Sequence, residues 1–455
     1  MSSDRPTIFA LSSGRPPAAV AVVRICGPQA GRALERLVGR VPRPRHAALA
    51  RVRDPADGEV IDEALALWFP GPNSETGEDM AEIQVHGGQA VIAALLGALA
   101  RIEGCRMAEP GEFTRRAFIN GRLDLTEVEG LADLIAAETP AQRHQAYRQL
   151  KGLIGDQADV WRRQIIEALA LVEARIDFSD EADVPEDLVG PALHAAQQLR
   201  DTIAASLADG GRGERLREGL VVAIAGPPDA GKSTLLNRLA RREAAIVSPY
   251  PGTTRDVIEV HLDLAGFPVT LLDTAGMRLS DDPIEREGIR RAATRAAAAD
   301  LVLWVIDSQA TEQSAGDIFE NRGKTECWLV RNKIDLVGDK LWINCESPSI
   351  SYGKELAVSA ATGAGIEALI GALAAYAQDY FAMTESALVT RARHRHALEE
   401  TVAALDRASA QGGSAHEELI AEELRAAATT LGRLTGRVDV EDILDVIFRD
   451  FCIGK

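Results

Sequence analysis

Residues 226–233 are Gly-Pro-Pro-Asp-Ala-Gly-Lys-Ser, which is the spacing of a phosphate-binding loop. The segment follows the apolar run Leu220–Ala225 and precedes a helical pattern over residues 234–241, the context that its chemistry requires. Backbone amides and the positive end of the helix dipole favour phosphate oxygens there. Lys232 would neutralise the β- and γ-phosphates, and the Ser233 hydroxyl would bind Mg²⁺. The contacts expected from this segment are Asp229, Ala230, Gly231, Lys232, Ser233 and Thr234.

A second motif concerns the choice of base. Residues 332–335 (Asn-Lys-Ile-Asp) follow the apolar run 328–331. The carboxylate of Asp335 can accept two hydrogen bonds, from N1–H and the 2-amino group of guanine, and adenine has neither donor. A backbone amide at Ser359-Ala360, after another short apolar run, would meet the guanine oxygen. The sequence therefore favours GTP over ATP.

Two more motifs concern Mg²⁺ and the γ-phosphate. Residues 273–276 (Asp-Thr-Ala-Gly) close the apolar run 269–272, and residues 252–256 (Gly-Thr-Thr-Arg-Asp) occur where a switch loop would bring Thr254 to the metal. With the phosphate loop and the two base motifs, they predict a GTPase domain. The further contacts expected with the nucleotide are Ser248, Thr253, Thr254, Asp273, Thr274, Ala275, Gly276, Asn332, Lys333, Asp335, Ser359 and Ala360.

The route to hydrolysis is less direct. Many small GTPases place a glutamine after the Asp-x-x-Gly motif to orient the attacking water, and here that residue is Met277. A thioether is a poor hydrogen-bond partner for water. Help must therefore come from a cation, from another acid or from a partner.

The elements around these motifs indicate an inserted domain. From Leu220 to about Tyr376, strands alternate with helices, which is typical of a parallel sheet with crossover helices. Before it, apolar residues recur at steps of three and four from Leu150 to Ile176 and predict one long helix. Another helix follows to about Leu207, then a glycine-rich linker at residues 210–213. The chain is helical again after the sheet, so the flanking helices would pack together.

The first part of the chain favours an α/β domain. Strands are expected at residues 19–25, 63–68 and 81–85, a loop at 69–77, and a helix at 89–103. We therefore expect an α/β plus all-α fold. Its domains would be residues 1–119, 120–215, 216–377 and 378–455, with the second and fourth forming one helical domain around the nucleotide domain.

Composition limits the class of protein and its partners. The 455 residues are 46 % hydrophobic and 26 % charged, and the apolar runs are too short for a bilayer, so we expect no membrane association. Five scattered cysteines without a Cys-x-x-Cys pair favour a reducing cytoplasm over a disulfide or zinc framework. The net charge of −18 disfavours indiscriminate nucleic-acid binding but leaves room for a local basic patch. Residues 40–51 and 391–395 are candidates, although a solvated surface is the simpler interpretation.

With these motifs, the whole chain resembles the MnmE (TrmE) family of bacterial tRNA-modification GTPases. Matching peptides are residues 69–74, 86–88, 110–113, 121–125 and the ending Phe451-Cys452-Ile453-Gly454-Lys455. The resemblance implies an N-terminal domain that binds 5-formyltetrahydrofolate or a related one-carbon tetrahydrofolate, a helical domain and an inserted GTPase domain. It also implies a homodimer that joins the flavoprotein MnmG (GidA) in a heterotetramer. Together they would add an aminomethyl or carboxymethylaminomethyl group to C5 of the wobble uridine (position 34) of tRNA.

The resemblance also implies a folate site. Arg24, Glu82 and Lys455 match family residues at the folate, and Arg122 stands where the family commonly has lysine. A guanidinium keeps the charge but replaces a point charge by a planar fork. Cys452 resembles a family cysteine implicated in the modification chemistry, although a lone cysteine is often a buried small hydrophobe.

For hydrolysis, the resemblance implies a K⁺ ion in place of an arginine finger. Its ligands would come from Asp229, Ser248, Tyr250 and Thr253, and Glu285 would help orient the attacking water. This chain has Asp229 where the family has asparagine, and prolines on both sides of Tyr250. The added negative charge and the stiffer loop put K⁺ activation in question.

A ribosome-assembly or regulatory switch GTPase is the alternative function, because such proteins share the same GTPase motifs. They would be expected to carry an RNA-binding module. The chain has no Gly-x-x-Gly loop of a KH domain after residue 377, and the Cys452 ending has no purpose in that setting.

Overall fold

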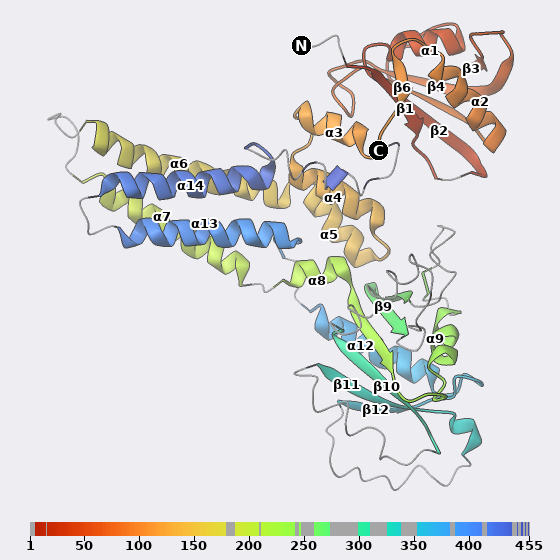
Figure 1. The fold of residues 1–455 in the computed structure, drawn as a ribbon, viewed down its shortest axis with the longest axis vertical. Coiled ribbons are helices and arrows are strands. Elements are labelled where there is room, and N and C mark those ends of the chain that lie inside the picture. Colours follow the sequence, from red (N-terminus) through yellow and green to blue (C-terminus); the bar gives the residue numbers. More distant parts are fainter. Residues whose placement is uncertain are drawn as a thin grey trace, which may run out of the picture. The chain divides into compact units, whose positions relative to one another are not determined.

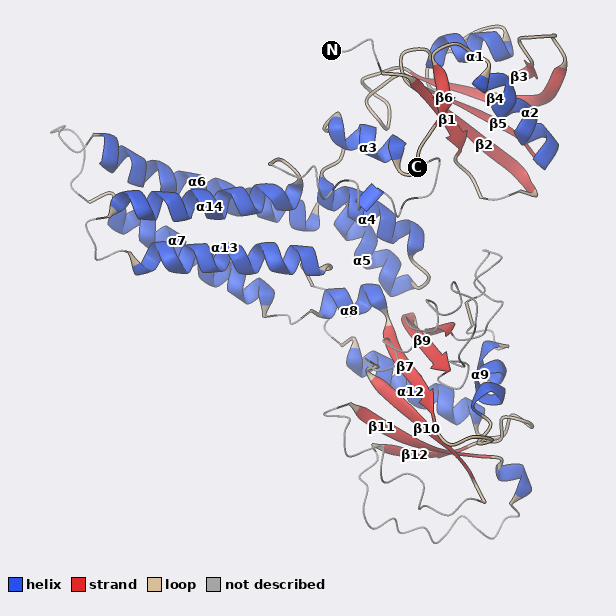
Figure 2. Ribbon diagram, in the orientation of Figure 1, coloured by secondary structure: helices blue, strands red, loops and turns tan. Residues whose placement is uncertain are grey.

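The computed structural model describes residues 5–14, 16–178, 187–208, 211–241, 245–246, 259–273, 299–309, 325–337, 353–382, 387–411 and 416–438, and positions 444, 447, 448, 451 and 454. They form two compact units, one of Met1–Ala132, Gln149–Gln197 and Ala403–Lys455, the other of Asp133–Arg148 and Gln198–Val402. Each unit contains one six-stranded sheet together with helices (Figures 1 and 2). The expected α/β plus all-α fold is confirmed, and the four domain boundaries stay predictions.

The first unit contains a mostly antiparallel sheet with the order β3-β4-β5-β2-β1-β6. Helices α1 (Ala30–Val38) and α2 (Gln89–Ala100) cover one face, where Val23, Ile25 and Ile83 are buried beneath them. Successive strand residues point to opposite faces, so Arg24 and Cys26 lie on the face that also carries Phe113 of α3 (Glu112–Ile119). The strands are β1 (Thr7–Leu11), β2 (Ala18–Cys26), β3 (Ala48–Arg53), β4 (Val60–Phe69), β5 (Met80–Gly87) and β6 (Cys105–Met107).

Helices of the first unit pack along one another. Helix α6 (Leu153–Asp177) lies against α14 (Glu417–Thr435), where Arg425 pairs with Glu173 at 2.7 Å (Figure 2). Its buried stripe begins at Ile154. The expectation of one helix from Leu150 is wrong, because α5 (Pro140–Leu150) ends there and Gly152, with φ +85°, starts the new helix in the left-handed region. Helices α4 (Leu125–Ala136), α7 (Val189–Leu207) and α13 (Ala392–Ala410) each have residues in both units.

The expected linker at residues 210–213 is also corrected. Helix α8 (Arg212–Glu218) starts inside it, after Gly211, whose φ is +71°. Gly213 is buried in this helix, and a Cβ there would lie 2.1 Å from the carbonyl oxygen of Val389. This glycine therefore permits close packing between two segments rather than flexibility.

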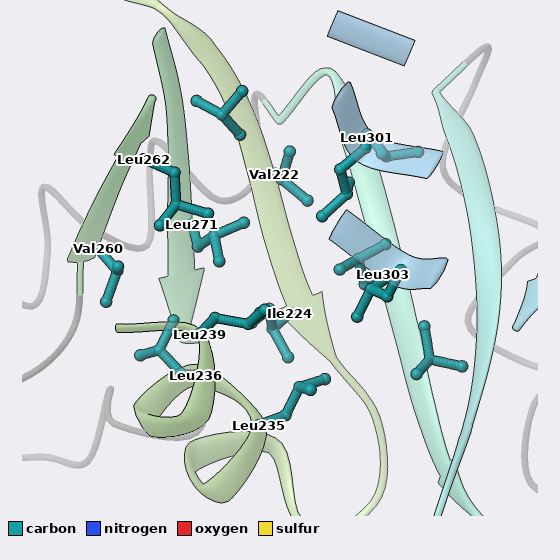
Figure 3. Close-up of a cluster of buried hydrophobic side chains, with 14 of the residues drawn as sticks. Val222, Ile224, Leu235, Leu236, Leu239, Val260, Leu262, Leu271, Leu301 and Leu303 are labelled. Carbon is teal, nitrogen blue, oxygen red and sulfur yellow. The ribbon is translucent and has the colours of Figure 1, made fainter. Parts of the chain in front are cut away.

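The second unit contains the nucleotide-domain sheet, with the order β12-β11-β10-β7-β9-β8. Its ladders are parallel except for the β8–β9 hairpin. The strands are β7 (Leu220–Ala225), β8 (Glu259–Leu264), β9 (Phe267–Asp273), β10 (Leu301–Asp307), β11 (Glu326–Asn332) and β12 (Lys354–Ala357). Leucines of α9 (Lys232–Ala240) pack on Val222 and Ile224 of β7 and on Leu271 of β9 (Figure 3), and α12 (Ile366–Tyr380) adds Leu369 and Leu373 to the same core.

Strand direction decides where the motifs meet. Because β7, β9, β10 and β11 run in parallel, their carboxyl ends lie at one edge of the sheet. The phosphate loop, Asp273, Asp307 and Asn332 all follow or end these strands. Within the described part of the chain, no helix is long and apolar enough to cross a membrane.

Candidate functional site

At two positions, the backbone of the phosphate loop adopts a conformation that only glycine allows. Gly226 has φ +145°, and a Cβ there would lie 2.0 Å from the carbonyl oxygen of Val305 on β10. Gly231 has φ +88°, and its Cβ would lie 2.3 Å from Nδ2 of Asn332. Asp229 also adopts a positive φ of 61°, which asparagine and aspartate tolerate better than most residues. The loop is thus tightly wrapped against β10 and the base motif.

Lys232 begins α9 directly after this loop. Its Nζ donates hydrogen bonds to the carbonyl oxygens of Gly226 at 2.9 Å and Pro227 at 2.7 Å, and the residue is buried. The ammonium group therefore lies across the loop, where the helix dipole also favours an anion.

Ser233 and Asp273 come together at the ends of α9 and β9. The Ser233 Oγ donates to Oδ2 of Asp273 at 2.7 Å, and Asp273 is only 2 % exposed. A hydroxyl and a carboxylate are the oxygen ligands that Mg²⁺ accepts, and this ion usually takes one or two protein ligands alongside phosphates. Among the described residues, no group of three or more His, Cys, Asp or Glu forms a separate metal cluster.

Asn332 connects the base motif to the phosphate loop. Its Nδ2 donates to the carbonyl oxygen of Ala230 at 2.8 Å, and its Oδ1 accepts from the backbone amide of Ala360 at 2.9 Å. The residue is 1 % exposed. Three segments far apart in the sequence are thereby fixed to one another.

Asp335 is held by a neighbour from the last motif. The Ser359 Oγ donates to its Oδ1 at 2.5 Å, and Ser359 is fully buried. The amides expected to meet the guanine oxygen already have acceptors, because Ser359 N donates to the Ala364 oxygen at 2.8 Å and Ala360 N to Asn332. Asp335 is the middle residue of a short 3₁₀ turn, Ile334–Leu336, which follows β11.

Asp307 also lies beside these motifs, although the sequence motifs did not predict it. Its Oδ2 lies 2.9 Å from Nζ of Lys333, which has φ +63°. Hydrogen bonds from the Gln309 amide and then from Lys333 lower the pKa of the Asp307 carboxyl. The available signal was its place directly after the apolar run of β10, like Asp273 after β9.

A second group of charges lies on the first sheet. Arg24 on β2 and Glu82 on β5 are direct cross-strand partners, and the Arg24 Nη2 donates to Glu82 Oε1 at 3.0 Å. Its Nη1 pairs with Glu75 at 2.9 Å, and the guanidinium lies over the Phe113 ring, 5.8 Å from its centroid. Glu75 was missed because the loop that carries it has no periodic pattern. Arg122 lies against the same loop, since a Cβ at Gly77 would be 3.3 Å from its Cγ.

A buried ion network supports this loop. Arg116, 5 % exposed, pairs with Glu78 at 2.9 Å and with Glu112 at 3.0 Å. Cys26 contacts the Thr76 hydroxyl at 3.1 Å, and burial raises the pKa of its thiol to about 12. These contacts hold the 71–79 loop over the face that carries Arg24.

Gly454, near the end of the chain, lies beside the same sheet. The Ser12 Oγ donates to the Gly454 oxygen at 2.7 Å, and a Cβ at Gly454 would be 2.1 Å from the Leu11 oxygen. The Phe448 oxygen would likewise be 2.8 Å from a Cβ at Gly111. Gly454 therefore lies at the end of β1, the strand that pairs with the Arg24-bearing β2.

Two family models together span most of the chain. Residues 7–122 match the N-terminus of the GTP-binding protein TrmE, and residues 125–452 match the MnmE helical domain. The second match alone includes more than half of the sequence. The chain belongs to the MnmE family.

Curated relatives agree with the MnmE assignment over their full length. The tRNA modification GTPase MnmE of Bradyrhizobium sp. (strain ORS 278) is 58 % identical over 99 % of both chains. That of Rhodopseudomonas palustris (strain BisB18) is 56 % identical over 100 % of both, and that of Methylorubrum populi 53 % over 99 % of this chain and 98 % of its own. Their names favour a tRNA-modification GTPase over a ribosome-assembly or regulatory switch GTPase.

Solved structures give weaker matches. The G domain of the T. maritima FeoB iron transporter is 28 % identical, with TM-score 0.25, over 35 % of this chain and 99 % of its own. A GTP-binding protein of Sulfolobus solfataricus in complex with GDP is 17 % identical, with TM-score 0.25, over 62 % of this chain and 84 % of its own. At such TM-scores the likeness carries no weight, and MnmE membership rests on the sequence matches.

Several of the expected site residues, some from the GTPase motifs and some from the MnmE resemblance, lie outside the residues that the structure describes. They fall between the described segments, around the switch motifs and in the tail. The residues outside the described ones are Ser248, Tyr250, Thr253, Thr254, Thr274, Ala275, Gly276, Glu285, Cys452 and Lys455. Thr234 lies in α9, directly after Ser233.

Proposed function

We propose that this chain binds and hydrolyses GTP and uses that cycle to modify tRNA. The product would be an aminomethyl or carboxymethylaminomethyl group on C5 of the wobble uridine, made together with an MnmG-type flavoprotein in a heterotetramer. The chain would act as a homodimer in the cytoplasm. Family membership supports a GTPase that acts in tRNA modification. The flavoprotein partner, the uridine position and the homodimer are proposals that go beyond it.

The observation that best supports GTP binding is the pair of hydrogen bonds made by the Asn332 side chain. It holds the phosphate loop at Ala230 and the last motif at Ala360 in a fixed relation to Asp335. Phosphate and base ends of a nucleotide must be bound at once, so their spacing has to be rigid. Ser359 aims the Asp335 carboxylate, the group that would read N1–H and the 2-amino group of guanine.

Mg²⁺ would be held by Ser233 and Thr254, with Asp273 acting on its coordination shell. When bound there, Mg²⁺ would supply positive charge that offsets the negative charge developing on the phosphates during hydrolysis. Lys232 would bind the β- and γ-phosphates, for which it exchanges its present bonds to Gly226 and Pro227. Asp229, Ser248, Tyr250 and Thr253 would form the K⁺ site. Glu285 would orient water.

The one-carbon site would lie on the first sheet. Arg24 and Arg122 offer guanidinium groups for glutamyl carboxylates, and Glu82 offers an acceptor for pterin donors. The docked Gly454 supports this proposal, because Cys452 and Lys455 are two residues and one residue away from it in the chain. We propose that Lys455 joins the tetrahydrofolate site and that Cys452 serves the modification chemistry.

GTP turnover in K⁺ against Na⁺, with Asp229→Asn alongside, tests the hydrolysis proposal. Strong K⁺ dependence of the parent protein would show that Asp229 serves the ion. Equal rates in both salts, with K⁺ dependence only in Asp229→Asn, would mean that this chain has left the K⁺ mechanism. No GTP turnover in either salt would refute the GTPase proposal.

The tRNA step needs a separate test in cells. The chain is expressed in a bacterium that lacks its own member of the family, and wobble uridines are analysed by mass spectrometry. Restored modification by the parent, and none by Cys452→Ser despite normal GTP turnover, is the expected result. Failure of the parent to restore it would contradict the tRNA proposal and leave GTP hydrolysis untouched.

A further inference from the structure

Residues 30–53 of the first unit form a basic segment in an acidic chain. They contain a single acid, Glu35, whereas the whole chain has a net charge of −18. The segment consists of α1, the turn after it and β3, and α1 packs against β3 at one edge of the sheet (Figure 1). A local excess of one charge attracts ligands of the opposite charge. The arginines of the segment are Arg32, Arg36, Arg40, Arg43, Arg45, Arg51 and Arg53.

Two of these arginines are used within the β3–β4 hairpin. Arg51 Nε donates to Oε1 of Glu63, its cross-strand partner, at 2.8 Å. Arg53 Nη1 donates to the Gly58 oxygen at 2.9 Å. Both bonds close the hairpin, so these two side chains stabilise the sheet edge rather than hold an external ligand.

Four other arginines of the segment are exposed. Helix α1 buries Leu34 and Leu37 against the sheet, which leaves Arg32 and Arg36, one turn apart, on its outer side. Gly39 ends the helix with φ +80°, and the next two arginines follow it in the chain. Within the described ranges, none of the four guanidinium groups makes a hydrogen bond or an ion pair. These four residues form the basic face: Arg32, Arg36, Arg40 and Arg43.

The basic face ends beside the loop that follows β4. Two residues further along the chain, the Arg45 amide donates to the Trp68 oxygen at 2.8 Å, and the Arg45 guanidinium donates to the Asn73 oxygen. The same loop carries Glu75, which pairs with Arg24 at 2.9 Å. A ligand that lies along the basic face therefore reaches the loop of the proposed one-carbon site.

The other basic candidate of the sequence, residues 391–395, is largely neutralised. Arg391 Nη2 donates to Asp133 at 2.6 Å, and Arg395 Nε donates to Glu214 at 3.2 Å. An acid in direct contact cancels most of the field that an arginine presents to an external anion. The basic face, with one acid among its residues, is therefore the better candidate for binding an anionic partner.

We propose that the basic face binds the sugar–phosphate backbone of a folded RNA. This inference deepens the proposed tRNA function and rests on it. Guanidinium forks match the geometry of phosphate oxygens, and counterion release from the RNA makes such contacts favourable. Contacts of this kind position a nucleic acid without reading its sequence. The face would thus hold the RNA in one orientation beside the one-carbon site and leave the choice of base to that site.

The test compares double variants of the full chain. Arg36→Ala with Arg40→Ala removes two contacts at the centre of the basic face, and Arg32→Ala with Arg43→Ala removes the two outer ones. Arg36→Lys with Arg40→Lys keeps the charge but not the fork. Affinity for an unmodified tRNA transcript is measured by filter binding from about 50 to 200 mM KCl, a range over which phosphate contacts show their salt dependence.

The matched control removes the same charge from another surface of the first unit. Arg407→Ala with Arg425→Ala lies on α13 and α14, where both side chains are 56 % exposed but are paired with Glu423 and Glu173. Since these arginines are already neutralised, their loss should leave tRNA affinity and its salt dependence as in the parent. GTP turnover should be the same in every variant and confirms that each is folded.

Each alanine variant of the basic face should bind tRNA about tenfold more weakly at low salt, and its slope of log affinity against log salt should decrease by roughly two. The loss should be equal for two tRNAs of different sequence, because phosphate contacts carry no sequence information. The lysine variant should keep the parental slope and lose at most about threefold in affinity, since the slope depends on charge.

Four results would overturn the proposal. They are parental affinity and slope in both alanine variants, an equal loss in the control, no tRNA binding by the parent at any salt, and loss of binding to the flavoprotein with tRNA affinity intact. The last result would assign the face to a protein partner. Wobble modification in the complemented strain judges the proposed function separately. Restored modification together with parental tRNA affinity in the variants would refute the basic face and leave that function standing.

Discussion

The Asn332 side chain lies within hydrogen-bonding distance of the Ala230 carbonyl oxygen, at 2.8 Å, although the two residues are 102 positions apart. This bond joins the base motif to the phosphate loop in a buried environment. Removal of the amide would leave both the Ala230 oxygen and the Ala360 amide without this partner. We therefore expect the bond to contribute to stability as well as to nucleotide affinity.

Asn332→Ala should lower the free energy of unfolding by about 1–3 kcal/mol, because two buried polar groups lose their partner. GTP affinity should fall with it, and Asn332→Asp, which keeps the acceptor for Ala360 N, should be intermediate. Denaturant titration and binding of a fluorescent guanine nucleotide measure the two effects. Parental stability in Asn332→Ala would contradict the role given to this bond.

Glycine 226 should be intolerant of any side chain, since its Cβ would lie 2.0 Å from the Val305 backbone oxygen at a φ of +145°. Gly226→Ala should abolish nucleotide binding. Gly371→Ala is the matched control in α12, where a Cβ meets nothing within 4 Å, and alanine should stabilise that helix by up to about 1 kcal/mol. Equal effects of the two substitutions on binding would refute this explanation.

Because Glu75 pairs with Arg24, it would compete with the anionic ligand proposed for the first sheet. Glu75→Gln should strengthen binding of 5-formyltetrahydrofolate by roughly two- to fivefold, because a half-exposed ion pair is worth about 0.2–1 kcal/mol. Glu82→Gln should weaken it, since that carboxylate is the proposed acceptor. Isothermal titration calorimetry with both variants measures the change. Weaker binding in Glu75→Gln would mean that Glu75 contacts the ligand itself.

Cys26 should resist alkylation in the folded protein. Burial raises the pKa of its thiol from 9.0 to about 12, so at pH 8 the thiolate is about a thousandfold rarer than in the unfolded chain. Iodoacetamide labelling followed by mass spectrometry should modify Cys26 only after denaturation.

The same pKa shift gives a pH dependence of stability. The raised folded pKa stabilises the fold fully below pH 9, and that stability is lost as pH rises from 9 towards 12, when only the unfolded thiol ionises. Cys26→Ala should flatten this part of the stability profile. A profile identical to that of the parent would assign the alkaline loss to other groups.

The sequence predicted features that depend on neighbouring residues better than features that depend on residues far apart in the chain. The phosphate loop could be predicted because its glycines, Lys232 and Ser233 act through local backbone geometry and a helix N-terminus. Asp273 and Asn332 were placed correctly at strand ends because apolar runs of that length form buried parallel strands. The sequence did not predict the break at Gly152 or the start of α8. A pattern of helical spacing does not show where a glycine adopts a left-handed backbone conformation and a new helix begins.

By itself, the sequence determined the fold class, the GTPase motifs and the choice of guanine, since each is encoded within a few neighbouring residues. Only the tertiary structure decided that Arg24 pairs with Glu75 and Glu82 and that Gly454 lies beside Ser12. These contacts depend on strand register and on which helix faces are buried. Both follow from packing between distant segments, which local spacing does not encode.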